Sequence, residues 1–131
     1  MLQNFRPREG GASGDRTTFG NYPLVGEVFV DGANPASDTQ VFFYTCQAPG
    51  RVRNLGVELV SPRTAGTLTF QLKKNGVAVA GIVVTINNSN PTRAEIAADV
   101  ACVDNDRLTV HMTNTGYAPA TNAGKITLLM S

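Results

Sequence analysis

Much of the chain alternates between apolar and polar positions with a period of two, the pattern of strands with one buried face. The clearest segment is residues 66–73, where every second side chain is Leu or Phe. Asn75-Gly76 follows it and predicts a tight hairpin, because both central positions of a type I′ turn need a positive φ. The return strand is expected over residues 77–86, with a bend at Gly81.

Six further segments show the same alternation, and turn clusters rich in Gly, Pro, Asn and Asp separate them. In one of them Val52 is out of phase with Leu55 and Val57, which predicts a bulge between Arg53 and Gly56. The eight strands together predict an all-β fold, an antiparallel eight-stranded jelly-roll-like sandwich; immunoglobulin-like and partly open barrel folds are the alternatives. The six segments are residues 25–30, 40–46, 52–60, 95–102, 107–113 and 125–130.

The first 24 residues contain several glycines and prolines and no periodic apolar pattern. A segment of this kind cannot bury enough apolar surface to order by itself. We therefore divide the chain into an extended N-terminal arm, residues 1–24, and a sandwich domain, residues 25–131. The arm is expected to be held by a neighbouring chain, the alternative being that it packs on its own sandwich.

Charge and composition narrow the classes of function. Charged residues make up 16% of the chain and the net charge is +1, with no run of one sign. This argues against nucleic-acid binding, which needs a basic surface. No apolar stretch is long enough to span a membrane, and the N-terminus lacks the apolar region of a signal peptide. Synthesis in a cytoplasm is the expectation.

Reactive side chains are few. His111 is the only histidine, and the alternation places it away from the core with Thr109 and Thr113, so a surface or interface role is expected rather than catalysis. No nucleophile, phosphate-binding or dinucleotide motif is present, so we expect no catalytic residue, no metal site and no cofactor. Asp104 and Asp106 fit turn chemistry better than a calcium loop, because the downstream glycine and glutamate of an EF-hand are missing.

The two cysteines, Cys46 and Cys102, are far apart in sequence and belong to no CxxC motif. Two small buried hydrophobic residues in a reducing compartment are the expected state, with a disulfide or a metal pair as the alternative.

Few aromatic side chains are available for a binding surface. Phe42, Phe43 and Tyr44 are consecutive, so in a half-buried strand either Phe43 or its two neighbours must face outward; a strand buried on both faces is the alternative. An outward aromatic would suit a subunit interface. Tyr117 is the one ring expected in an exposed loop, where it could contact a sugar.

Three features resemble the β-sandwich modules of tailed-bacteriophage virion proteins, which include capsid decoration (cement) proteins and tail-fibre tips. They are Leu-Lys-Lys-Asn-Gly at 72–76, the Asp-rich turn and Arg-Leu-Thr-Val strand within 100–110, and the Ala/Pro/Asn loop at 118–123. One sandwich with a short arm is most similar to a cement protein.

The resemblance implies a non-enzymatic virion protein on the capsid surface, assembled in the host cytoplasm, which binds the major capsid protein as a homotrimer. A phage tail or fibre module that binds a host surface glycan is the alternative. By the same resemblance, the arm would clamp neighbouring shell subunits. Its apolar anchors would be Phe5, Phe19 and Tyr22, and Arg6, Arg8 and Arg16 would pair with shell carboxylates.

Overall fold

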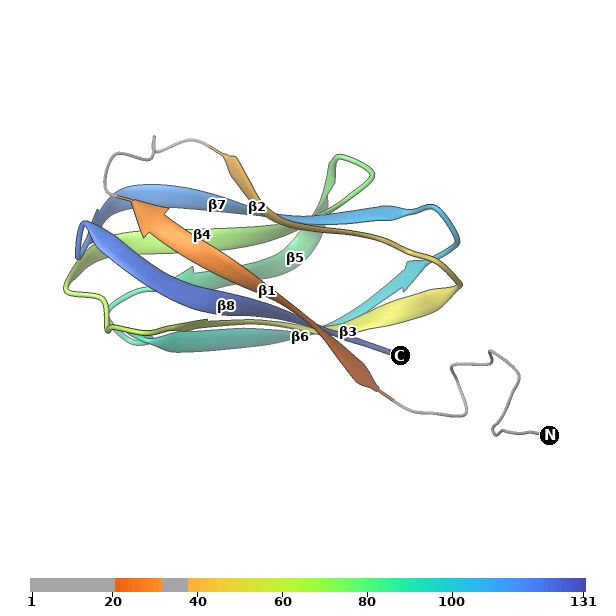
Figure 1. The fold of residues 1–131 in the computed structure, drawn as a ribbon, viewed down its shortest axis with the longest axis horizontal. Helices are drawn as coiled ribbons and strands as arrows, with labels where there is room; N and C mark the ends of the chain where they lie inside the picture. Colours follow the sequence, from red (N-terminus) through yellow and green to blue (C-terminus); the bar gives the residue numbers. More distant parts are fainter. Residues whose placement is uncertain (1–20, 32–37) are drawn as a thin grey trace.

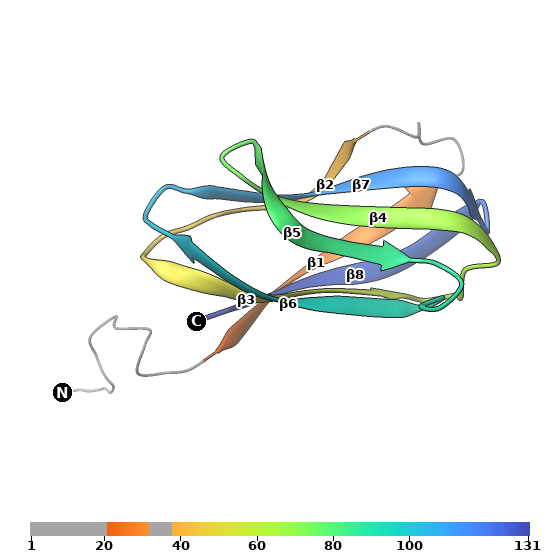
Figure 2. The same cartoon turned by 180° about the vertical axis from the view of Figure 1, so that it is seen from behind.

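The structure is a computed structural model that describes residues 21–31 and 38–131, and within them eight strands form two stacked sheets (Figures 1 and 2). The all-β expectation is confirmed, and the segments expected as strands from the alternation are strands. The strands are β1 (Tyr22–Asp31), β2 (Thr39–Thr45), β3 (Gly50–Leu59), β4 (Ala65–Lys74), β5 (Val77–Ile86), β6 (Arg93–Cys102), β7 (Arg107–Ala118) and β8 (Thr121–Met130).

The strand order gives the fold its topology. One sheet, here called sheet A, has the order β1-β8-β3-β6, and the other, sheet B, has the order β2-β7-β4-β5. All neighbours are antiparallel. Only β4 and β5 are joined by a hairpin, and the pairs β3–β6, β2–β7 and β1–β8 enclose it in successive layers. This nesting is the jelly-roll arrangement of a two-sheet sandwich.

The core lies between the sheets and is built from the inward side chains of both. Leu68, Phe70 and Leu72 of β4, the residues of the clearest alternation, are fully buried. They face the inward residues of sheet A, so the period of two along each strand becomes one continuous apolar layer. Its other members include Val28, Val30, Cys46, Val52, Leu55, Val57, Leu59, Val84, Ile86, Cys102, Leu108, Val110, Met112, Ile126, Leu128 and Met130.

The predicted turn and bulges are present. Asn75 and Gly76 have φ values of 52° and 83°, as a type I′ turn requires. The register of β3 shifts between Val52 and Asn54, which brings Val52 into the core together with Leu55. The bend at Gly81, whose φ is 81°, lies in a bulge between the pairs Gln71–Val83 and Lys73–Ala78. The Gln71 amide donates hydrogen bonds to the carbonyls of Leu72, Val79 and Ile82 at 2.7, 2.9 and 3.3 Å, so it satisfies backbone groups that the bulge leaves unpaired.

Several strands are longer than the alternation predicts. Strand β1 begins at Tyr22, inside the segment assigned to the arm, and β7 continues to Ala118. The extension of β7 was missed because its inward position is Asn114 rather than an apolar residue. Asn114 is 7% exposed, and its side-chain oxygen accepts a hydrogen bond from the Tyr117 amide at 3.0 Å. A buried polar residue with a local partner interrupts the apolar pattern without ending the strand.

The two sheets come close together where β1 crosses β2. Gly26 of β1 lies against the ring of Phe42 from β2, and a Cβ atom on residue 26 would be 2.5 Å from Phe42 Cδ2. The ring therefore occupies the space of the missing side chain. Because the residue has no unusual φ, the requirement for glycine here is one of space alone.

We expect Gly26→Ala to lower the free energy of unfolding by about 1–3 kcal/mol, because overpacking forces Phe42 or the two strands to move. The measurement is urea denaturation of the full chain. Gly56→Ala is the matched control, since its nearest neighbour lies 3.7 Å away in ordinary contact, and its stability should be unchanged or slightly raised. Equal effects of the two substitutions would contradict this account.

Candidate functional site

The residues expected to contact a partner lie mostly outside the part of the chain that the structure describes. Phe5, Arg6, Arg8, Arg16 and Phe19 fall within residues 1–20, so their role stays a prediction. Tyr22 is part of β1 and pairs in register with Met130 of β8. It therefore belongs to the edge of sheet A, and the search for a binding surface turns to the sandwich itself.

The outward face of sheet A carries apolar side chains at one end. Phe29 of β1 is in register with Ala123 of β8, and the amide of Val60, just after β3, donates to the carbonyl of Ala123 at 2.7 Å. We call Phe29, Ala123 and Val60 the apolar row. Phe29 and Val60 are 71% and 78% exposed, far more than large apolar side chains usually are.

Next to the apolar row is a row of alternating charges that crosses the whole sheet. Glu27 of β1 pairs with Lys125 of β8, Lys125 with Glu58 of β3, and Glu58 with Arg93 of β6. The Lys125 ammonium lies 3.8 Å from the Glu58 carboxylate. Each charge thus has a neighbour of the opposite sign, so the row adds polarity to this face without a strong net field.

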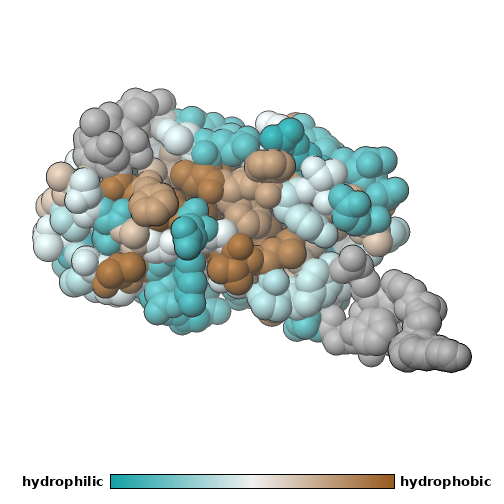
Figure 3. Space-filling model, viewed as in Figure 1, coloured by the Kyte–Doolittle hydropathy of each residue, from teal (hydrophilic) through white to brown (hydrophobic). Residues whose placement is uncertain are grey.

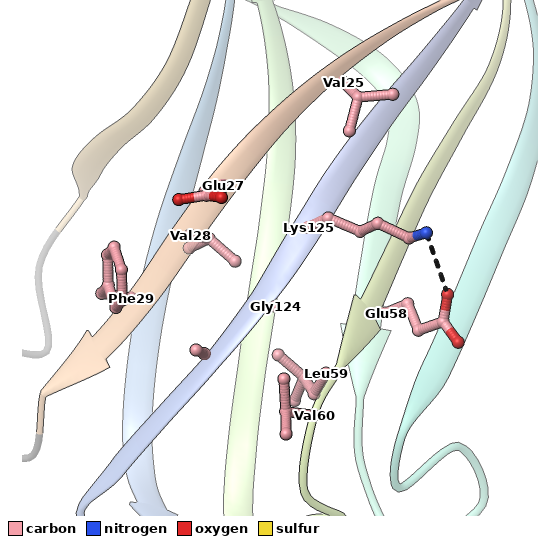
Figure 4. Close-up of a pocket in the computed structure, with 10 residues that line it drawn as sticks. Val25, Glu27, Val28, Phe29, Glu58, Leu59, Val60, Gly124 and Lys125 are labelled. Carbon is pink, nitrogen blue, oxygen red and sulfur yellow. Dashed lines mark ion pairs between the residues drawn. The ribbon is translucent and has the colours of Figure 1, made fainter.

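A shallow groove of about 630 Å³ joins the two rows (Figure 4). Its floor is formed by Val28, Leu59 and Gly124, and Val25 lies at the end beyond the charged row. Gly124 brings β8 close to β3, because a Cβ atom there would run into the carbonyl oxygen of Glu58. The groove combines an apolar floor with charged side chains on its walls, a composition suited to docking another protein surface.

The space-filling view shows this gathering of apolar side chains on the face that carries β1 and β8 (Figure 3). Val25, which is 59% exposed, adds to the patch. Val25 and Phe29 occupy outward positions of a strand whose inward positions, Val28 and Val30, are already apolar. Apolar residues on both faces of one strand were the sequence signal for this surface. An analysis that uses the alternation only to find core positions does not detect it.

The outward face of sheet B has a different character. Thr69 of β4 pairs with Thr85 of β5 and Thr113 of β7, and Thr67 pairs with Thr115. These rows of neutral hydroxyls are well suited to contact with water. The exposed large apolar side chains of sheet B, among them Phe43 and Val83, lie on its opposite edge strands, so a joined apolar row is what distinguishes sheet A as the candidate binding side.

Strand β2 settles which of its consecutive aromatic residues faces outward. Phe43 is 59% exposed, whereas Phe42 and Tyr44 are partly buried. The Arg107 guanidinium lies 4.8 Å from the centroid of the Phe43 ring, within the range of a cation–π interaction. Phe43 therefore has a partner in its own chain, and the strand is not buried on both faces.

His111 lies on the outward face of β7, as the alternation predicted, but its side chain is only 17% exposed. Its Nδ1 atom is 3.1 Å from the Asp38 carboxylate, an ion-pair distance without the alignment of a hydrogen bond. Its Nε2 atom is 3.1 Å from the Thr109 hydroxyl. The order Thr, His, Asp resembles a nucleophilic triad, yet Thr109 is 5% exposed and too buried to attack an external substrate. The arrangement connects β7 to Asp38, and Lys73 holds the same carboxylate.

The acidic turn after β6 is held by hydrogen bonds to the Asp106 carboxylate. One Asp106 oxygen accepts a hydrogen bond from the Val103 amide and the other from the Asn75 side chain, both at 2.9 Å. These bonds confirm turn chemistry for Asp106 and connect the turn to the β4–β5 hairpin. Among the described residues, no group of three His, Cys, Asp or Glu side chains could hold a metal ion. Nor does that part of the chain contain a helix of the length and apolarity that a membrane crossing requires.

The expected exposure of Tyr117 is wrong. The residue is 6% exposed, and its hydroxyl accepts a hydrogen bond from the Asn122 side chain at 2.7 Å. The same Asn122 amide donates to the Ser61 carbonyl at 2.8 Å. The apolar alternation of β7 ends at Met112, which predicts a loop at Tyr117; in the longer strand Tyr117 is an inward core residue and unavailable to a sugar.

No protein-family model and no curated protein sequence matches the chain. Among solved structures, a chain of the acidic stable capsid structure of Helicobacter pylori bacteriophage KHP30 is similar, with a TM-score of 0.50 and 10% identity. The match covers 85% of this chain and 90% of that chain. The globular domain of zebrafish complement 1qA protein matches with a TM-score of 0.47 and 13% identity, over 83% of this chain and 96% of that chain. At such identity, the likeness to the capsid chain shows a shared β-sandwich fold.

Three aspartates outside the groove accept hydrogen bonds that lower their pKa values. The hydrogen bond from Lys73 lowers the pKa of Asp38 below its ordinary value of 3.8. Hydrogen bonds from Arg51 and Asn75 lower the pKa of Asp99 and of Asp106 in the same way. Because each folded carboxyl binds its proton less readily than the unfolded one, these contacts stabilise the fold above the unfolded pKa and are lost as the pH falls through the folded one.

We therefore expect the free energy of unfolding to fall as the pH is lowered below 3.8. Urea denaturation at a series of pH values from roughly 2 to 6 measures this loss. Asp99→Asn removes one of the three carboxyls and should make the decline shallower. Identical slopes for the variant and the parent would show that the Arg51–Asp99 contact contributes nothing to the acid response.

Proposed function

We propose that the protein is a non-enzymatic structural protein of a tailed-bacteriophage virion, a capsid decoration subunit that binds the major capsid protein on the shell surface and stabilises it. The observation that carries the proposal is the apolar row with its groove on sheet A. A stable sandwich has no need to expose Phe29 and Val60 on one face, and such patches mark protein contacts. The fold shared with a phage capsid chain supports the same assignment.

The geometry of β1 sets the size of the proposed contact. The strand begins at Tyr22, where the arm joins the sandwich, and Phe29 lies near its other end. Seven residues of strand separate these points by roughly 23 Å. A shell surface engaged by both the arm and the apolar row must extend over at least this distance, which suits a clamp across neighbouring capsid subunits better than a single pocket.

In this proposal the arm supplies apolar and cationic anchors, and the sandwich supplies the flat face. A homotrimer would present three such sets of contacts, and linked binding multiplies the strength of individually modest contacts. In this proposal the subunit assembles in the host cytoplasm.

The first expectation is that the protein is present in purified virions at a simple fraction of the copy number of the major capsid protein. Quantitative mass spectrometry of purified particles measures the ratio. A handful of copies per particle would place the protein in the tail and favour the alternative, a module that binds a host surface glycan. Absence from particles would overturn the virion assignment.

The second expectation concerns the face that binds. Val60→Glu should weaken binding to shells that lack the protein by about tenfold or more, because a charge would be buried in an apolar contact. Val77→Glu is the matched control, since Val77 is also a highly exposed valine, at 69%, but lies at the β4–β5 turn. Cosedimentation with purified shells measures both, with thermal unfolding to verify that each variant is folded.

Deletion of residues 1–20 separates the arm from the face, because it leaves β1 complete. The truncated chain should fold and lose binding. Unchanged affinity after the deletion would refute the clamp, and equal binding by the Val60 and Val77 variants would refute the role of sheet A.

A further inference from the structure

The two cysteines, distant in sequence, meet at one end of the sandwich. Cys46 directly follows β2 of sheet B and Cys102 ends β6 of sheet A, and they are 1% and 2% exposed. Both are free thiols of the core between the sheets, and Cys102 is near enough to Cys46 to act on the pKa of its thiol. The burial of both cysteines confirms the expectation of two small core residues. The sequence contains no paired cysteine motif, so it did not predict that the two lie together.

Backbone hydrogen bonds fix this arrangement. The Cys46 amide donates to the Asp106 carbonyl and the Asn105 amide donates to the Cys46 carbonyl, both at 2.8 Å. Asn105 and Asp106 belong to the turn that begins directly after Cys102. The turn therefore holds the two cysteine backbones in a constant relation, as a disulfide bond requires.

One of the two cysteines borders a surface groove, although the residue is only 2% exposed. Cys102 lines a surface groove of about 590 Å³ whose walls include Pro49, Arg51 and Val103. Val103, its neighbour in the chain, is 56% exposed. Cys46 does not line this groove. A small reagent would therefore reach Cys102 first, with Cys46 behind it.

We propose that Cys46 and Cys102 are an oxidative modification site, where a low-molecular-weight disulfide converts the two thiols into one intramolecular disulfide bond between the sheets. The inference rests on the fold and is independent of the proposed virion function. In reducing compartments glutathione and thioredoxin keep protein thiols reduced, so we expect the bond to form after the protein has left one.

The reaction is two successive thiol–disulfide exchanges. The Cys102 thiolate attacks one sulfur of the reagent, the reagent's S–S bond breaks, and one thiol leaves with a proton from solvent. The Cys46 thiolate, its proton lost to solvent, then attacks the Cys102 sulfur and expels the second thiol. The protein loses two electrons and two protons, and the reagent is reduced to two thiols.

We expect the second exchange to be the rate-limiting step. Burial, together with the neighbouring Cys102 thiol, raises the pKa of Cys46 to about 12, so its thiolate is scarce at neutral pH. Below that value the thiolate fraction grows about tenfold for each unit of pH, and the rate of closure should grow with it. The pair is therefore stable as two thiols during synthesis and closes slowly afterwards.

The closed bond would brace the sandwich. It spans the chain from the end of β2 to the end of β6, and a cross-link over a loop of this length restricts the unfolded chain strongly. We expect the melting temperature of the oxidised protein to exceed that of the reduced protein by about 10 °C.

The test uses the full reduced chain incubated with oxidised glutathione at about pH 8, where thiolates begin to form. Free thiols are then alkylated and the intact mass is measured. The expected product is a monomer that has lost two hydrogen atoms, accepts no alkylating group, and yields one peptide pair joining Cys46 to Cys102. Dithiothreitol should reverse the change. In Cys46→Ala, glutathione should remain attached to Cys102, whereas Cys102→Ala should resist modification.

Three results would overturn the proposal: two alkylatable thiols after prolonged exposure, glutathione adducts on the parent chain without an internal bond, or bonds only between chains. A melting temperature lowered by oxidation would equally overturn it, since the bond would then distort the fold rather than brace it. The intact mass and the melting temperature of the wild-type protein are sufficient for the test, even if a cysteine variant folds poorly.

Discussion

The whole structure depends on burying the inward apolar rows of two sheets against each other. Polar contacts do not replace this burial. The ion pair between Arg51 and Asp99 joins side chains that are 44% and 63% exposed, so its contribution to stability is small beside the burial of the core, although its loss in acid adds to the pH dependence. The strands of each sheet are held together by their ladders, whereas the shared core holds one sheet on the other, with hydrogen bonds such as that from Asn122 to Tyr117 at its margin. Crowding at Gly26 against Phe42 shows how closely the two layers approach.

Because the inward faces are committed to the core, the outward faces are free to differ, and they do. Sheet B presents rows of threonine, whereas sheet A presents the apolar row, the row of alternating charges and the groove between them. A sandwich of this type can therefore stay soluble through one face and bind through the other. The proposed function places the shell on the second face, and the arm extends the same contact from the beginning of β1.

The period of two was sufficient to predict the eight strands, the hairpin at Asn75-Gly76 and the bulge near Val52, because each depends on local chemistry. It failed where an inward position is polar. Asn114 concealed the end of β7, and with it the burial of Tyr117. Pairings between distant strands cannot be predicted from a local pattern either. The structure was therefore needed to reveal the apolar row, which joins Phe29, Ala123 and Val60 from three segments. It was also needed to show that Cys46 and Cys102 lie near each other. Phe29 alone gave a sequence signal, as an apolar residue at an outward position.

The nesting of the strand pairs has a consequence for synthesis. Strand β1 is made first among the strands, and β8, its only neighbour in sheet A, is made last. Throughout translation β1, with apolar residues on both faces, has no ladder to join, while the inner pairs can already form around the β4–β5 hairpin. Contacts this distant in sequence close slowly, and an unpaired apolar strand can join another chain instead. Of the eight strands, β1 therefore waits longest for its neighbour, and the yield of native protein depends on how fast β8 reaches β1 compared with how often two incomplete chains meet.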